Sequence, residues 1–297
     1  MGLGFSIRRI RLLGAEEIGQ GVVSAAMVGA LVAFTLLLDS TVSSLVPQSA
    51  LPACASVQSP AGSPFGFYSC NLEALGNSLS GLSSSLSRAA DISGFASSLK
   101  VSVGVVSAQP FFAAEAASRS LSDASAQAQA LSALSFFEFE MNEFIRSSAL
   151  AVFLPAGLIL RTFFATRKLG AAAMGIAIAA YVVYPLLFLY TFTISQSLAA
   201  SSEATAHASS FNSQFASLPL LDLDQTGAVR DQIGAMSQGD FGGKIQQLFP
   251  SSSRALSLAG ADLVIFPIVS LIVSAVAALE LYRTLSAPIL LPYFESV

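Results

Sequence analysis

The sequence predicts an all-α integral membrane protein with four transmembrane helices and a long, coiled-coil-like helical hairpin in its extracellular region. Three observations predict this class. Apolar residues make up 54% of the 297 residues and charged residues only 11%, with a mean hydropathy of +0.69. This is too little charge to solvate the surface of an ordinary soluble protein. Several apolar stretches are long enough to cross a bilayer, and between the first two of them leucines repeat at helical spacing.

The expected transmembrane segments are residues 18–38, 147–164, 170–194 and 262–282. The segment 147–164 contains Pro155 and Arg161, but proline is tolerated in membrane helices and an arginine near a helix end can reach the headgroups. The first segment is expected to be an uncleaved anchor. Glu16 and Glu17 precede it, and no cleavage site with small residues follows Leu38, so a signal peptide is the weaker alternative.

The distribution of lysine and arginine predicts the orientation. Basic residues gather in or beside three short segments, the amphipathic N-terminus 1–17, the turn 165–169 and the tail 283–297. Short basic segments stay in the cytoplasm. Both termini are therefore expected inside a multi-pass cell-membrane protein, and the acidic regions 39–146 and 195–261 are expected outside.

The first outer region begins with a proline-rich stretch that contains both cysteines, Cys54 and Cys70. On an oxidising face of a membrane, a pair at this spacing most simply forms a disulfide, which predicts a cross-linked loop. The alternative is a redox switch or metal pair, but such a site usually has CxxC spacing or a nearby histidine, and neither is present.

After Cys70 the pattern predicts a helical hairpin. Its first helix carries a leucine seam at Leu72, Leu75, Leu79, Leu82 and Leu86. The second helix is expected from Phe111 to Arg146, with an apolar stripe that slips by three residues partway along the helix. The stripe comprises Leu121, Ala124, Ala128 and Leu131, then Leu134, Phe137, Met141 and Phe144. Nothing interrupts this helix before the second span, so a single helix is expected to run from the outer region into the membrane.

An acidic group on this helix, Glu138, Glu140 and Glu143, is expected just above the bilayer. It could attract cations at a pore mouth, but a solvated face with a Glu143–Arg146 pair is the favoured interpretation.

The second outer region is expected to extend the third span as a Ser/Ala-rich helix through His207. With no ligand residues beside it, His207 is interpreted as a surface histidine. Two short helices are expected further on, at 222–236 and 241–249, the second ended by Pro250.

The sequence predicts no catalytic, cofactor-binding or metal site, because one histidine, two cysteines and no tryptophan leave no cluster of reactive groups. Two other sets of residues are predicted to matter. Small residues that allow close helix packing are Ala171, Gly175, Ala179, Ser270 and Ser274. Residues expected to contact lipid or a partner at the cytoplasmic turn are Arg161, Phe163, Phe164, Arg167 and Lys168.

The stretch from Phe153 to Gly170, with Arg161, Phe163–Phe164 and Arg167–Lys168, followed by Tyr181 and Tyr184–Pro185, resembles a known hairpin. It is similar to the central hairpin of archaeal polytopic membrane proteins of DNA-transfer machinery. Those proteins are similar in turn to the polytopic inner-membrane subunit of type IV secretion systems. The resemblance implies a membrane channel subunit that works with other membrane subunits and with a cytoplasmic ATPase.

Two functions are therefore expected for a non-enzymatic protein. The first is a membrane subunit of a conjugation- or secretion-like complex, whose homo-oligomer or mixed assembly lines a conduit for DNA or protein. The second is a membrane-anchored structural or receptor-like protein whose helical ectodomain binds an extracellular partner. A net charge of −4 does not support a dedicated nucleic-acid-binding domain.

Overall fold

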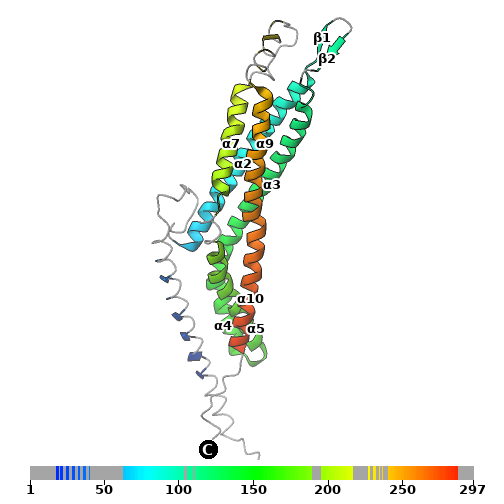
Figure 1. Cartoon of the computed structure of the whole chain (residues 1–297). Coiled ribbons are helices and arrows are strands. Elements are labelled where there is room, and N and C mark those ends of the chain that lie inside the picture. Colours follow the sequence, from blue (N-terminus) through cyan, green and yellow to red (C-terminus); the bar gives the residue numbers. More distant parts are fainter. Residues whose placement is uncertain are drawn as a thin grey trace, which may run out of the picture.

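The computed structural model describes residues 63–103, 106–109, 111–188, 195–216 and 240–286, together with scattered residues between 18 and 40 and between 227 and 236. The described chain forms an elongated stack of two helical bundles (Figure 1). The distal bundle consists of α2 (Pro64–Ser98), α3 (Ala114–Ser148), α7 (Ser197–Gln214) and α9 (Phe241–Gly260). The apolar bundle consists of α4 (Leu154–Thr162), α5 (Arg167–Ile178) and α10 (Phe266–Ser286). Apart from a small two-stranded hairpin, the secondary structure described is helical.

The distal bundle begins with the hairpin of α2 (Pro64–Ser98) and α3 (Ala114–Ser148). Ser63 caps α2 by accepting a hydrogen bond from the Gly66 N–H at 3.0 Å, and Pro64 follows in the first helical turn, where its missing N–H costs nothing. The two helices are joined through the antiparallel strands β1 (Val101–Val103) and β2 (Val106–Ala108). The leucine seam expected on α2 is buried throughout.

The other two helices of the distal bundle are α7 (Ser197–Gln214) and α9 (Phe241–Gly260). The helices α2, α3, α9 and α7 contact one another in a closed ring; α2 and α7 run away from the apolar bundle, and α3 and α9 run toward it. Four phenylalanines pack at the tip, with ring centroids 5.0 to 5.6 Å apart: Phe111, Phe211, Phe215 and Phe241. They fix the end of the bundle that lies farthest from the apolar helices.

Two helices continue from the distal bundle into the apolar bundle without a break. The first passes from α3 through the π-helical turn η2 (Ala149–Phe153) into α4 (Leu154–Thr162), and the second from α9 through η6 (Ala261–Ile265) into α10 (Phe266–Ser286). The first confirms the expected single long helix, because it is continuous over Ala113–Thr162. The short helix expected to end at Pro250 is wrong. Pro250 lies inside α9, where packing on α7 and α3 outweighs the lost backbone hydrogen bond.

The apolar bundle is completed by a short turn, η3 (Phe164–Thr166), by α5 (Arg167–Ile178) and by η4 (Ala179–Val183), with residues 184–188 still helical. Glycines let these helices approach closely. A Cβ added at Gly170 would lie 2.6 Å from the Gly157 carbonyl oxygen, and one added at Gly175 would lie 2.9 Å from the Ala278 carbonyl oxygen. Larger side chains at either position would push the helices apart.

Three helices in the described part are long and apolar enough to cross a membrane: Ala113–Thr162, Arg167–Phe188 and Phe241–Ser286. The chain is thus membrane-embedded. They correspond to the expected segments 147–164, 170–194 and 262–282. The first expected segment, 18–38, lies mostly outside the described residues. Those described there are helical, with Ile18, Val22, Leu36 and Leu37 at least 60% exposed.

The expected slip of the α3 stripe is wrong. Every seventh residue from Ala114 to Ala149 is buried: Ala114, Leu121, Ala128, Ser135, Asn142 and Ala149. The seam therefore keeps one register along the whole helix. Phe137 and Phe144, which were expected to point inward, are 63% and 58% exposed. Hydrophobicity alone therefore predicts the wrong register for α3. In the half of the helix nearer the apolar bundle, buried positions carry polar side chains that form hydrogen bonds with α2.

Those bonds form a ladder between α2 and α3. Serines at positions 118, 125 and 132 of α3 donate to the carbonyl oxygens of Ala90, Ser83 and Gly76 at 2.8 to 2.9 Å, seven residues apart on both helices. Ser83 Oγ returns a bond to the Ser125 carbonyl at 3.0 Å. Each bond satisfies a hydroxyl between the helices, and the small residues on both sides permit the close approach.

Candidate functional site at the junction of the two bundles

The bundles meet at a level where three helices change their winding. The π-helical turns η2, η4 and η6 each insert extra backbone into an otherwise α-helical segment. η2 contacts η4, and η6 contacts α3. Single π turns are rare and are often found at functional sites, because they re-aim side chains and loosen the backbone ladder. The junction is therefore a candidate functional site.

A buried aromatic and acidic cluster fills the α2–α3 side of this junction. Tyr68 of α2 is fully buried and donates a hydrogen bond to Glu138 Oε2 of α3 at 3.0 Å. The Tyr68 ring stacks on Phe188, with centroids 4.3 Å apart. Phe188 in turn meets Tyr184 edge to face at 4.7 Å. Three aromatic side chains from two segments thus gather around the Glu138 carboxyl group.

A second carboxyl group approaches from the η6 side. Asp262 is 5% exposed, and its charge acts on Glu138 across the junction. Ser195 Oγ donates to Asp262 Oδ2 and accepts the N–H of Ser197 at 3.1 Å. Asp262 therefore also holds the first turn of α7. Two buried acids from different long helices face one another here, which is unfavourable when both are charged.

Next to this pair, a polar chain links α2 to the exposed surface of α3. Asn142 Nδ2 donates to Ser69 Oγ at 2.7 Å, and Ser69 donates to Glu143 Oε1 at 3.0 Å. The expected Glu143–Arg146 pair is present, with Arg146 Nη2 2.7 Å from Glu143 Oε2. The interpretation of the whole acidic group as a solvated face is wrong for Glu138, which turns inward to Tyr68.

The environment shifts the acid–base behaviour of this cluster. Glu138 lies on the part of α3 that precedes the apolar segment 147–162. Burial, together with the charge of Asp262 and against the opposing Tyr68 hydrogen bond, raises the pKa of Glu138 to about 8. Burial and the neighbouring Glu138 also raise the pKa of Tyr68 well above its usual value. Glu138 is therefore largely protonated at neutral pH.

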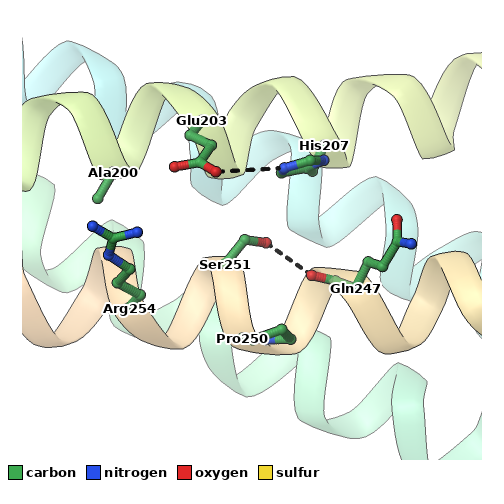
Figure 2. A pocket seen from close by; sticks show the side chains of 7 residues that line it. All are labelled: Ala200, Glu203, His207, Gln247, Pro250, Ser251 and Arg254. Atoms are coloured by element: carbon green, nitrogen blue, oxygen red, sulfur yellow. Dashed lines mark hydrogen bonds and ion pairs between the residues drawn. The ribbon is translucent and has the colours of Figure 1, made fainter.

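A separate groove of about 310 Å³ lies on the distal bundle between α7 and α9 (Figure 2). Glu203 and His207 line it from α7, with His207 Nε2 3.8 Å from Glu203 Oε1. Arg254 of α9 faces them and donates to Gln196 Oε1 at 3.4 Å. His207 lies at the surface with 47% of its side chain exposed. The groove offers one carboxylate, one imidazole and one guanidinium to a polar partner.

The expected contact residues of the cytoplasmic turn do not form one surface. Arg161 is only 8% exposed and donates through Nη2 to the Leu285 carbonyl at 3.1 Å, at the end of α10. Arg167 is half-buried at the start of α5. Lys168 is exposed, and Phe163 is 62% exposed, whereas the Phe164 side chain lies outside the described atoms. The turn thus has a buried cation behind an exposed cation and an exposed ring.

The expected packing residues lie in helix contacts. Ala171 and Ala179 are no more than 1% exposed, and Gly175 meets the α10 backbone. Ser270 and Ser274 of α10 are also buried. Of the expected disulfide, Cys70 is buried in α2 and Cys54 lies outside the described residues, so the bond stays a prediction. Among the described residues, no three His, Cys, Asp or Glu side chains gather as a metal site.

Sequence reasoning missed Tyr68, Tyr184 and Asp262 as members of a site. Asp262 marked only the edge of an apolar stretch, Tyr184 entered only through the hairpin resemblance, and Tyr68 carried no signal. The seven-residue spacing of Ala128, Ser135 and Asn142 could have indicated that Glu138 shares their buried side of α3. Comparison with known proteins adds no assignment: no protein-family model, no curated protein and no solved structure matches this chain.

Proposed function

We propose that the chain is a non-enzymatic membrane subunit of an oligomeric, conjugation- or secretion-like complex. The observation that carries the proposal is an exposed apolar strip on the continuous helix α3–η2–α4. Phe137, Phe144, Val152 and Ile159 follow one another at intervals of seven, eight and seven residues and are 57% to 63% exposed. The interval of eight spans η2, whose π turn takes up one additional residue. The four side chains therefore form one straight apolar strip along the helix.

The half of this strip that lies on the distal bundle has no lipid to cover it. Phe137 and Phe144 lie beside Glu138, Glu140, Glu143 and Arg146, on the part of α3 that precedes the apolar segment. Exposed phenylalanines among charged residues favour a protein partner. A strip that repeats about every seven residues fits the side of a second helix. We therefore propose that the partner is a second copy of the chain.

A conduit in such a complex would lie between copies. The contacts at Gly157, Gly170 and Gly175 bring the described apolar helices together along their backbones. They leave little room for a passage within one chain, so DNA or protein would pass along a path enclosed by several subunits. We further propose four spans, with 18–38 as the first, and an orientation with both termini and residues 165–169 in the cytoplasm.

The alternative function is that of a membrane-anchored, receptor-like protein. The groove between α7 and α9 supports it, because Glu203, His207 and Arg254 offer both signs of charge on the distal bundle. α3 and α9 pass directly into α4 and α10, so a partner bound there would act on helices that reach into the membrane.

The test of the oligomeric subunit is the mass of the detergent-solubilised full chain, measured by light scattering or native mass spectrometry. We expect the wild-type protein to be oligomeric and a Phe137→Ser, Phe144→Ser double variant to be monomeric with unchanged helical content. Phe112→Ser is the matched control, because Phe112 is 73% exposed in the turn that precedes the other end of α3. A monomeric wild type, or an oligomeric double variant, would overturn the proposal. A monomer whose residues 18–38 become protease-sensitive in the double variant would show that the strip holds that segment instead.

A further inference from the structure

The three π turns at the junction share one sequence pattern. Residues 149–155, 179–185 and 261–267 each read Ala-x-x-Val-x-x-Pro, and in each the π turn occupies the first five positions. In each turn the residue before the proline donates its backbone N–H to the carbonyl oxygen of the alanine that opens the pattern. These donor and acceptor pairs are Leu154 and Ala149, Tyr184 and Ala179, and Phe266 and Ala261.

The prolines explain why the winding changes at these places. A proline in a helix has no N–H for the carbonyl four residues earlier, and its ring crowds that carbonyl. A bond across five residues instead of four carries the helix past the proline, but with fewer backbone hydrogen bonds than an α-helix has. Pro250 provides the contrast. Lys244 stands six residues before it in place of alanine, and α9 forms no π turn there.

The turns lie where the two bundles are joined. Within the described residues, the distal bundle continues into the apolar bundle through two helices, α3–η2–α4 and α9–η6–α10, and each has its π turn and proline at the junction (Figure 1). The third turn, η4, packs against η2. Sharp bends in helices occur mainly at prolines and π turns. Both described connections are thus weakest at the same level.

We propose that the three Ala-x-x-Val-x-x-Pro turns form a hinge, at which the distal bundle tilts as a unit relative to the apolar bundle. The helices on either side are held more firmly, by the buried leucine seam and serine ladder of α2 and α3 and by the backbone contacts at Gly157, Gly170 and Gly175. Bending therefore concentrates between the bundles. The hinge does not depend on the oligomeric assembly, because all three turns belong to one chain.

The first test measures distances by double electron–electron resonance on the full chain in lipid nanodiscs. Spin-labelled unnatural amino acids leave the native cysteines intact, and dilution with unlabelled chain restricts the signal to distances within one copy. One label pair spans the junction, at the exposed positions Ser209 of α7 and Leu279 of α10, and a second pair, Ser209 and Ser122, lies within the distal bundle. We expect the distance distribution of the spanning pair to be about twice as wide. Equal widths would overturn the hinge.

Replacement of the prolines tests whether the turns are the cause. Pro155→Ala with Pro267→Ala supplies the missing N–H in both connecting helices. We expect the spanning distribution to narrow to the width of the distal pair, while circular dichroism and the distal distance stay unchanged. Pro250→Ala is the matched control, because it supplies an N–H inside α9 away from any π turn, and it should leave the spanning width unchanged. A double variant as broad as wild type would contradict the proposal.

Hydrogen exchange of the wild-type chain gives a measurement that needs no variant to fold. Residues 261–266 lie nearer the apolar bundle than residues 252–257 of α9, so access to water alone would make their amides exchange more slowly. A hinge reverses this order, because its backbone bonds open more often. We expect several-fold faster exchange at 261–266, and likewise at 149–154 compared with 140–145. Slower or equal exchange at both turns would show that they are fixed features of the packing.

Discussion

Glu138 shows how a single side chain depends on the fold around it. An isolated glutamate ionises near pH 4.5, whereas burial beside Tyr68 and Asp262 raises the pKa of Glu138 to about 8. The folded chain therefore binds this proton more tightly than the unfolded chain does. Between about pH 4.5 and 8 the unfolded state loses the proton while the folded state keeps it. Glu138 consequently lowers stability progressively as pH rises through this window.

We expect Glu138→Gln to remove this contribution. Gln keeps a carbonyl oxygen that can accept the Tyr68 hydrogen bond, but it cannot ionise. The stability of the variant relative to wild type should increase from pH 5 to pH 9, by on the order of a few kcal/mol. Thermal or denaturant unfolding in detergent at several pH values measures this. Glu140→Gln, at an exposed neighbour on the same helix, should follow the wild-type curve. Parallel curves for Glu138→Gln and wild type would contradict the buried-proton interpretation.

At the scale of elements, the serine ladder explains how α2 and α3 pair although their contact is only partly apolar. Ser132 is 6% exposed and donates to the Gly76 carbonyl at 2.9 Å. A Cβ added at Gly76 would already lie 3.1 Å from the Phe136 ring. The helices are thus close enough that side-chain size, and not hydrophobicity, decides what fits the seam.

The close approach of the helices predicts that a larger, more hydrophobic side chain in the seam lowers stability. Ser132→Leu makes α3 more hydrophobic and more helix-prone, yet it should destabilise the chain by about 1 to 3 kcal/mol because the larger side chain forces the helices apart. Ser132→Ala should cost less, about 1 kcal/mol, because it removes one hydrogen bond and adds no volume. Denaturant unfolding followed by circular dichroism measures both. Ser122→Leu, at an exposed position of α3, should be neutral, and a stabilised Ser132→Leu would show that the seam is not closely packed.

The serine ladder also shows which features of α2 and α3 the sequence could predict. The leucine seam of α2 and the long helix through Ala149 were predictable, because leucine spacing and the absence of breakers determine them directly. The register of the lower half of α3 was not, since Ser135 and Asn142 occupy core positions there. Serine and asparagine look solvent-facing in a sequence. Their burial becomes favourable only when the Leu72 carbonyl and Ser69 supply acceptors from α2.

The junction site was less predictable for a related reason. Tyr68, Glu138 and Asp262 come from three segments that are brought together only by the packing of α2, α3 and η6. Their pairing depends on where the π turns fall, and the local sequence of η6 indicates a π turn only once η2 and η4 are seen to share its alanine-to-proline spacing. Pro250 shows the same limit, because the surrounding bundle decides whether a proline ends a helix.

At the scale of the whole molecule, the charges differ between the two ends of the apolar bundle. At the junction lie Glu138, Glu143 and Asp262, whereas Arg161, Arg167 and Lys168 gather at the opposite end. A chain inserts with its basic ends on the cytoplasmic side. The distal bundle continues from the acidic end of the apolar bundle. The turn at residues 163–166 connects α4 to α5 at the basic end. This asymmetry supports the proposed orientation.

The orientation is tested with single cysteines at the two ends and a membrane-impermeant thiol reagent. Ser209 is exposed on α7 of the distal bundle, and Ala165 is exposed in the turn between α4 and α5. We expect the reagent to label Ser209→Cys in intact cells, and Ala165→Cys only after the membrane is permeabilised. The unmodified chain, whose Cys70 is 3% exposed, controls for labelling of native cysteines. Labelling of Ala165→Cys alone in intact cells would invert the orientation. Labelling of both would mean that the helices between these positions do not separate the two sides of the membrane.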